Sequence, residues 1–306
     1  MRTRRRFISE FAFALSVLGF RGTAAATLEW AGLQTPAAKR EPAVQLPNAS
    51  DSLKFAVLGD FGTGSREQYQ TADQMFKVHG KFPFELVITV GDNIYGGERP
   101  QDLKRKFEEP YKSLLDAGVR FYASLGNHDA RDQSRYKLFN MDGKTYYTFK
   151  APKQDVRFFA LESDYPTPAQ MQWLEKELDA SGERWKIPYF HHPLYASGKH
   201  GSNEELRKVL EPMFVKYGVT VVFTGHEHFY ERIKPQQGIV NFVTGSGGQL
   251  RRGDIDRRTG LTAVGFDTDR VFMAIEIDGD RLVFNAISRV GEIIDSGIIE
   301  RRKLPE

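Results

Sequence analysis

Several short apolar runs in this sequence end in residues that can bind a metal ion. The runs lead to Gly59-Asp60, Gly91-Asp92, Gly126-Asn127-His128-Asp129 and Gly225-His226-Glu227-His228, and one more, Ile187-Pro188-Tyr189-Phe190, leads to His191-His192. A short, unbroken apolar run is typical of a buried strand. The side chains that follow carry carboxylate, amide and imidazole groups, which suit iron, manganese and zinc. The chain contains no cysteine, so thiolate ligands and disulfides are excluded.

Residues that follow neighbouring parallel strands converge, because the carboxyl ends of such strands share one rim of the sheet. We therefore expect six side chains to meet at this rim: Asp60, Asp92, Asn127, His191, His226 and His228. A two-metal centre needs an anion that bridges cations about 3.5–4 Å apart, and a carboxylate serves this purpose. Asp92 is the expected bridge.

Each of these signals is weak when it is taken alone. A Gly-Asp pair after a strand is commonly a turn or a helix cap. His226 and His228 are also compatible with a hydrogen-bonded pair beside a turn. It is the recurrence of the pattern, always after a strand, that predicts a metal site.

The segments between the apolar runs carry helical patterns. Apolar residues recur at spacings of three and four in segments 66–79, 102–116, 169–180 and 204–217. Strands that alternate with helices predict an α/β protein. After Ile239 the pattern changes to strands and turns, with Asp278-Gly279 as a tight turn in an antiparallel meander. We predict one domain over residues 51–306, made of two packed β-sheets flanked by helices.

The N-terminus has the pattern of an export signal. A basic start and a moderately apolar stretch precede Ala24-x-Ala26, a small-residue cleavage pattern. The segment Thr3-Arg4-Arg5-Arg6-Phe7-Ile8 is similar to the bacterial twin-arginine motif, and a basic amphipathic tail is the alternative. The apolar stretch is too short to span a membrane. We expect residues 1–26 to direct export to the periplasm or the medium, and the Ala- and Pro-rich residues 27–50 to form a linker.

The composition is that of an ordinary globular protein. Of the 306 residues, 40% are hydrophobic and 27% are charged, which supplies a large core. The formal charge of +3 is too small to indicate a nucleic-acid partner. The sequence does not predict the oligomeric state.

Five blocks of the sequence together resemble the ligand blocks of the calcineurin-like metallophosphoesterase superfamily. The blocks are Asp60-Phe61-Gly62, Gly91-Asp92-Asn93-Ile94-Tyr95, Gly126-Asn127-His128-Asp129, His191-His192-Pro193 and Gly225-His226-Glu227-His228. Many relatives carry a histidine two residues after the first aspartate, whereas this chain has Gly62 there and Tyr95 three residues after Asp92. These two differences separate the purple acid phosphatase branch. The chain resembles the small, single-domain, tartrate-resistant form of that branch over roughly residues 53–228.

The resemblance implies a four-layer αββα fold and a dinuclear metal centre. It implies an Fe(III) site held by Asp60, Tyr95, His228 and the bridging Asp92, and a divalent site for Fe2+, Zn2+ or Mn2+ held by Asp92, Asn127, His191 and His226. A phenolate suits Fe(III), a hard trivalent ion that displaces the phenol proton. Two residues depart from the family pattern: Pro188 lies within the strand before His191, and Phe190 stands where relatives often carry glycine.

The resemblance also implies the hydrolysis of phosphate monoesters. Two cations bind the anionic substrate and offset charge that develops in the transition state. A metal-bound water ionises to hydroxide and attacks the phosphorus. Asn127, His128 and His200 are expected to bind the substrate, and either His128 or His200 protonates the leaving group. His200 lies in segment 197–201, which resembles the family's substrate-side loop, and a plain surface loop is the alternative.

The sequence also suggests roles for Asp129, His192 and the charged segment 251–258. Asp129 either orients a ligand or His128, or caps a turn. His192 is expected to point away from the metals. The charged segment 251–258 either steers anionic substrates or forms a solvated loop.

The leading hypothesis is an exported acid phosphatase that acts on small phosphate monoesters with an Fe(III)–M(II) pair, with no nucleic-acid partner and no membrane span. The first alternative is a phosphodiesterase or nuclease with the same metals. A metal-containing binding protein without catalytic activity is a more distant alternative. The sequence does not predict the natural substrate, the second metal or the pH optimum.

Overall fold

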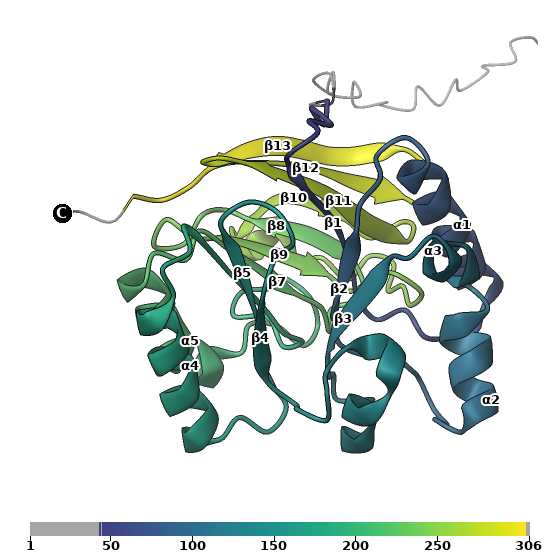
Figure 1. The fold of residues 1–306 in the computed structure, drawn as a ribbon, viewed down its shortest axis with the longest axis horizontal. Coiled ribbons are helices and arrows are strands. Elements are labelled where there is room, and N and C mark those ends of the chain that lie inside the picture. The colour runs from purple at the N-terminus through teal and green to yellow at the C-terminus, as the bar shows by residue number, and fades with distance from the viewer. Residues whose placement is uncertain (1–42, 44, 304–306) are drawn as a thin grey trace, which may run out of the picture. The chain divides into compact units, whose positions relative to one another are not determined.

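The structure, a computed structural model, describes residues 43 and 45–303. Two mixed β-sheets pack against each other and helices cover their outer faces (Figure 1). The predicted α/β fold of two sheets flanked by helices is therefore confirmed. The predicted export segment, residues 1–26, lies outside the described residues, as do residues 27–42 and 44 of the predicted linker. In the part of the chain that the structure describes, no helix is long and apolar enough to cross a membrane.

The first sheet has six strands in the order β13-β12-β11-β1-β2-β3. The strands are β1 (Leu53–Leu58), β2 (Leu86–Val90), β3 (Arg120–Ser124), β11 (Val271–Asp278), β12 (Arg281–Ser288) and β13 (Ile293–Glu300). β1, β2 and β3 run parallel, and β11, β12 and β13 form the predicted antiparallel meander. The turn between β11 and β12 is Gly279-Asp280 and not Asp278-Gly279, because Asp278 still pairs with Arg281.

The second sheet has seven strands in the order β10-β8-β9-β7-β6-β5-β4. The strands are β4 (Tyr147–Lys150), β5 (Val156–Ala160), β6 (Trp185–Tyr189), β7 (Val221–Thr224), β8 (Tyr230–Ile233), β9 (Val240–Thr244) and β10 (Thr262–Phe266). The central strands β5, β6, β7 and β9 are parallel, and the outer ones pair antiparallel.

Pro188 weakens the pairing between β6 and β7. The carbonyl of Tyr189 accepts from Leu161 beside β5, whereas the N–H of Phe190 donates to Phe223 of β7. Since successive residues of a strand face opposite neighbours, Pro188 also faces β7, where it has no N–H to donate. The register between β6 and β7 is accordingly limited to Tyr189 and Phe223. The strand that leads to His191 is thus less tightly paired on this side.

Three of the four predicted helices form nearly as expected, and the second is broken. The helices are α1 (Arg66–His79), α2 (Pro100–Leu103), a π-helical turn η1 (Lys104–Glu108), α3 (Lys112–Asp116), α4 (Pro168–Ala180) and α5 (Glu204–Lys216). Pro110 accounts for the break, because it has no N–H for the carbonyl of Lys106 four residues earlier. That carbonyl accepts instead from the side chain of Gln68 on α1.

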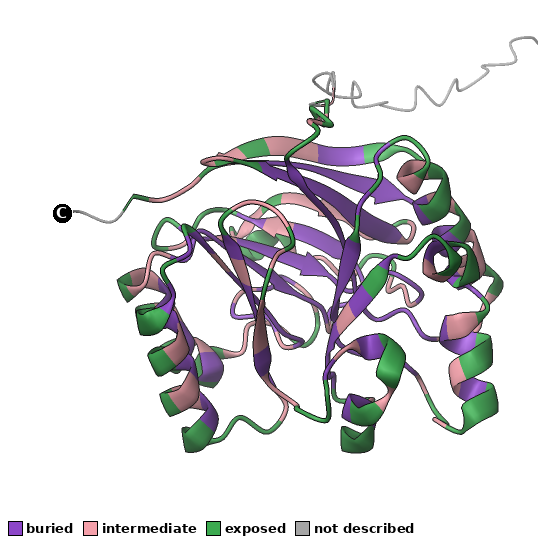
Figure 2. Ribbon diagram, in the orientation of Figure 1, coloured by how far each residue is buried: buried purple, intermediate pink, exposed green. Residues whose placement is uncertain are grey.

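The main core lies between the two sheets, whose strands are mostly buried while the helices expose their outer faces (Figure 2). The ring of Phe55 on β1 lies edge-on to Phe158 of β5, with 5.2 Å between centroids, and to Phe223 of β7, at 6.2 Å. All three rings are fully buried. This aromatic contact joins the two sheets within the core.

We expect Phe55→Ala to lower the free energy of unfolding by about 3–5 kcal/mol, because it removes a buried ring and leaves a cavity. Phe76→Ala on α1, where the residue is 43% exposed, is the matched control and should lower it by less than about 1 kcal/mol. Urea unfolding of the two variants measures the difference. Equal losses of unfolding free energy in the two variants would show that Phe55 contributes no more to stability than an exposed phenylalanine.

Candidate metal centre

Three of the candidate ligands have an unusual backbone conformation. Asp60, Asp92 and His226 have φ angles of 52°, 49° and 70°. This left-handed region is uncommon for residues other than glycine, although Asp, Asn and His enter it more readily than most. Each residue follows the glycine after a buried strand, so the chain turns sharply where β1, β2 and β7 end. Conformations of this kind concentrate at functional sites.

The recurring glycines allow the strand ends to approach one another closely. A Cβ on Gly126 would lie 2.3 Å from the backbone nitrogen of Asp92. A Cβ on Gly225 would lie 2.4 Å from Oδ2 of Asp60. A side chain at either position would force the loops apart, which explains why the sequence places glycine before the polar residue.

The structure brings Asp60, Tyr95 and His228 together as one group. The Tyr95 hydroxyl lies 3.2 Å from Oδ1 of Asp60 and 3.1 Å from Nε2 of His228. The same Oδ1 and Nε2 are 3.4 Å apart. One donor atom each of Asp60, Asp92 and His228 lie within 4.8 Å of one another, so Asp92 borders this group.

Asn127, His191 and His226 form a second group around Nε2 of His191. This atom lies 3.0 Å from Oδ1 of Asn127, 3.1 Å from Nδ1 of His226 and 3.4 Å from Oδ1 of Asp92. On the other side of the ring, Nδ1 lies 2.9 Å from the carbonyl oxygen of Val90. A proton on Nδ1 donates to that carbonyl, which leaves the lone pair of Nε2 directed at the group.

The spacing of the donor atoms fits a pair of metal ions. Ligand atoms about 2.1 Å from one metal, at tetrahedral or octahedral angles, lie about 3.0–3.4 Å apart. The distances in both groups run from 3.0 to 3.4 Å. Asp92 borders both groups, as a bridging carboxylate must. All the donors are oxygen or nitrogen, which suits iron, zinc or manganese.

Burial sets the electrostatics of these groups. It raises the pKa of Asp60 well above its ordinary value, and the neighbouring Asp92 carboxylate raises this pKa further. Burial likewise raises the pKa of Tyr95 and lowers that of His191 well below its usual range. The neutral imidazole is the form that binds metal, and bound cations would favour the ionised carboxylates and phenol.

Asp129 connects two of the loops that carry these residues. Its carboxylate accepts hydrogen bonds from the backbone N–H of Gly126 at 2.9 Å, of Asn93 at 3.0 Å and of Ile94 at 3.0 Å. These bonds tie the loop after β3 to the loop after β2. The bond from Gly126, three residues earlier, is the capping contact of a turn, and the described contacts of Asp129 include none to the side chain of His128 or of a candidate ligand.

His128 and His200 are exposed and contact different groups. The ring centroid of His128 lies 4.9 Å from that of Tyr95, and the centroid of His200 lies 4.4 Å from that of His226. A hollow of about 810 Å³ lies beside His128, and a smaller one of about 340 Å³ lies beside His200. Each histidine therefore has open space next to it for part of a substrate.

The prediction that His192 points away from the metals is wrong. Its ring centroid lies 4.5 Å from that of His226, and donor atoms of His191, His192 and His226 lie within 4.8 Å of one another. Its Nδ1 lies 3.0 Å from Oγ of Ser163. The two adjacent histidines follow the end of β6, so the alternation of a strand, which would separate their side chains, does not apply there.

Glu227 is a residue near the site whose role the sequence reasoning missed. Its side chain is fully buried, and burial raises its pKa to about 7. Its Oε1 accepts a hydrogen bond of 2.7 Å from the N–H of Gly201, in the loop that carries His200. A Cβ on Gly198 of that loop would lie 2.4 Å from Oε2 of Glu227. The glycine at position 198 is therefore the one feature of the sequence that indicates this close approach.

The two ends of the charged segment 251–258 have different surroundings. Arg258 is exposed and pairs with Asp256 at 2.8 Å, as in a solvated loop. Arg251 is only partly exposed, and its backbone N–H donates to the carbonyl of His228 at 2.9 Å.

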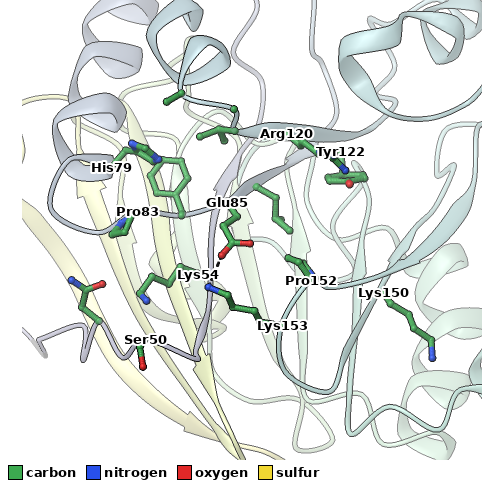
Figure 3. Close-up of a pocket in the computed structure, with 16 residues that line it drawn as sticks. Ser50, Lys54, His79, Pro83, Glu85, Arg120, Tyr122, Lys150, Pro152 and Lys153 are labelled. Atoms are coloured by element: carbon green, nitrogen blue, oxygen red, sulfur yellow. Dashed lines mark ion pairs between the residues drawn. The ribbon is translucent and has the colours of Figure 1, made fainter.

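A larger hollow, of about 910 Å³, lies at the opposite ends of the parallel strands (Figure 3). It includes Lys54 of β1, Glu85 before β2 and Arg120 of β3, and Glu85 pairs with Lys153 at 2.7 Å. None of the candidate ligands lines it. The volume of a hollow therefore does not by itself identify the position of the metal centre.

Comparisons with known proteins agree with this arrangement. The calcineurin-like phosphoesterase family model matches residues 53–230, a segment that contains both groups of donors. Purple acid phosphatase 17 of Arabidopsis thaliana is 30% identical over 247 residues, which is 69% of this chain and 73% of the relative. Tartrate-resistant acid phosphatase type 5 of Homo sapiens is 24% identical over 67% of this chain and 77% of its own length.

Two solved structures share the fold at low sequence identity. GAP50, described as the anchor in the inner membrane complex of Plasmodium, has a TM-score of 0.70 at 19% identity over 82% of this chain and 90% of its own. The purple acid phosphatase PPD1 of yellow lupin has a TM-score of 0.68 at 19% identity over 84% of this chain and 55% of its own. Taken with the match of the family model to more than half of the sequence, these findings show that the chain belongs to the calcineurin-like phosphoesterase family.

Proposed function

We propose that this chain is an acid phosphatase that hydrolyses small phosphate monoesters at a dinuclear metal centre. The observation that carries the proposal is the convergence of seven predicted ligands into two adjacent groups that both border Asp92. The names of the relatives, which are purple and tartrate-resistant acid phosphatases, support the same activity.

The charges of the two groups support an Fe(III)–M(II) pair. Asp60 and Tyr95 can both become anionic, whereas Asn127, His191 and His226 are neutral ligands. With Asp92 shared, the first group offers the greater negative charge and suits a trivalent ion. Fe(III) would be held by Asp60, Tyr95, His228 and Asp92, and a divalent ion by Asp92, Asn127, His191 and His226.

The remaining chemistry falls to exposed residues beside these groups. When bound, the metal pair offsets the charge of the phosphoryl group and acidifies the attacking water. Asn127, His128 and His200 are exposed, so a substrate can reach them. The amide of Asn127 can bind a phosphoryl oxygen, and His128 or His200 can protonate the oxygen of the leaving group.

Iron loading tests the proposed phenolate ligand. We expect the iron-loaded protein to show a visible tyrosinate-to-iron absorption band, and Tyr95→Phe to lose the band while it keeps its fold. Tyr165→Phe, at a residue that is 67% exposed, is the matched control and should keep the band. A parent protein that binds iron and stays colourless would overturn the ferric assignment.

Loss of one imidazole tests the second group. We expect His191→Ala to weaken retention of the divalent metal and to lower monoester turnover by more than about 100-fold, since even residues that only orient a ligand matter 10- to 100-fold. His79→Ala, on α1 away from both groups, is the control and should keep metal and turnover. Metal analysis is paired with assays on p-nitrophenyl phosphate and bis(p-nitrophenyl) phosphate. Faster diester cleavage by the parent would favour a phosphodiesterase.

Export through the twin-arginine route is a further part of the proposal, and the motif at residues 3–8 supports it. This route carries folded proteins, so metals could be loaded before export. We expect a bacterial host to place the protein in the periplasm, and replacement of Arg4 and Arg5 by lysine to retain it in the cytoplasm. Replacement of Arg21 by lysine is the control. Unchanged export of the double variant would rule out this route.

A further inference from the structure

Two buried polar atoms face each other beside the candidate metal centre without forming a hydrogen bond. Oε2 of Glu227 and Nη1 of Arg251 lie 3.9 Å apart, and neither has a hydrogen-bond partner among the described residues. An N–H···O bond is about 2.9 Å long. Because buried polar groups are almost always bonded, this pair requires an explanation.

The backbone of Arg251 is hydrogen-bonded to the turn that carries His226 and His228. Its backbone N–H donates to the carbonyl of His228 at 2.9 Å. Further along the same segment, the N–H of Asp256 donates at 2.8 Å to the carbonyl of Ser197, at the start of the loop that carries His200. The segment that begins with Arg251 is therefore attached both to the ligand turn and to the His200 loop.

Glu227 is the acidic side chain that faces the guanidinium of Arg251. The carboxylate is fully buried, and Arg251 is its one ion-pair partner within 4.0 Å in the described part of the chain. Oε1 is already occupied by the N–H of Gly201, so Oε2 is the atom left to face Arg251. A buried carboxylate needs such a cation nearby.

The guanidinium of Arg251 has N–H donors without a protein partner in the ranges that the structure describes, and it lies close to the candidate metal centre. A guanidinium offers five donors, and no side-chain hydrogen bond of Arg251 to another described residue accompanies its approach to Glu227. The side chain is 33% exposed, so it can meet a ligand from solvent. Its backbone bonds the carbonyl of His228, a candidate ligand, and its partner Glu227 bonds the N–H of Gly201, which follows the candidate proton donor His200.

We propose that Arg251 binds a phosphoryl oxygen of the substrate and that Glu227 positions its guanidinium. The inference rests on the proposed function and adds a substrate contact outside the metal ligands. The planar fork of a guanidinium matches the oxygens of a phosphate group and remains charged at any relevant pH. The neighbours Arg252 and Arg257 are exposed, and Arg258 is paired with Asp256.

Binding of inorganic phosphate to the metal-loaded protein, followed by calorimetry, tests the contact without turnover. We expect Arg251→Gln to weaken phosphate binding about 10- to 100-fold, as for the loss of a charged hydrogen bond. Arg251→Lys should recover part of the loss, because it keeps the charge without the fork. Arg252→Gln, at an adjacent exposed arginine, is the control and should bind like the parent. Parent-like binding by Arg251→Gln would overturn the proposal.

A double-mutant cycle tests the positioning role of Glu227. We expect Glu227→Gln to weaken phosphate binding in the parent and to have little further effect once Arg251 is replaced by glutamine. Additive losses would show that Glu227 does not act through Arg251. Melting temperature and metal content are measured for every variant. If phosphate affinity falls only in variants that also melt at a lower temperature or hold less metal, Arg251 has a structural role instead.

The same measurements separate this inference from the proposed function. If the parent hydrolyses no phosphoester but binds phosphate through Arg251, the proposed function fails and the contact stands. If the parent hydrolyses monoesters and Arg251→Gln binds phosphate as tightly as the parent, the contact alone fails.

Discussion

Two carboxylates, Asp60 and Asp92, are buried beside each other at the ends of neighbouring strands, and the rest of the site depends on them. They are 0% and 1% exposed, and burial together with the neighbouring Asp92 carboxylate raises the pKa of Asp60, so charge on Asp60 is costly at this depth. Backbone donors offset part of this cost: the N–H of His226 bonds Asp60 at 3.0 Å, and the N–H of His128 bonds Asp92 at 2.9 Å. These bonds are also cross-links. Asp60, which follows β1 of the first sheet, holds the loop after β7 of the second, so the proposed metals would sit where the two sheets are joined.

Much of the fold could be predicted from the sequence because its signals are local. β1 and β2 are mostly apolar runs, interrupted by Lys54 and Thr89, and they are buried over their whole length. The break at Pro110 was also visible in principle, since proline cannot continue the hydrogen-bond ladder of a helix. The supporting contacts of the site were not accessible in this way. Glu227 and Gly201 are 26 residues apart, and Asp129 and Asn93 are 36 apart, so these pairs exist only once distant loops are brought together.

The fold by itself does not decide between catalysis and another role. The anchor protein of Plasmodium and the lupin phosphatase match this chain at TM-scores of 0.70 and 0.68, which are nearly the same. The donor atoms, and the different charges of the two groups that they form, are what distinguish a catalytic role from another role. A group that holds Asp60 and Tyr95 beside one that holds Asn127, His191 and His226 creates two unlike sites a few ångströms apart. The proposed ferric assignment depends on Tyr95, since without its phenol the first group would lose one of the anionic ligands that the proposal invokes for a trivalent ion.

A site built on loops is usually less precise than one built on strands or helices. Here the loops are braced by carboxylates that accept backbone N–H groups: Asp60 from His226, Asp92 from His128, Asp129 from Gly126, Asn93 and Ile94, and Glu227 from Gly201. A carboxylate suits this task because it accepts several bonds at once and each bond is charge-assisted. Asp60, Asp92 and His226, which take part in these bonds, are also the residues with left-handed conformations. The acidic residues therefore have two roles. They supply negative charge for cations, and they fix the loops that carry the imidazoles. Metal binding and loop geometry thus depend on the same arrangement of carboxylates.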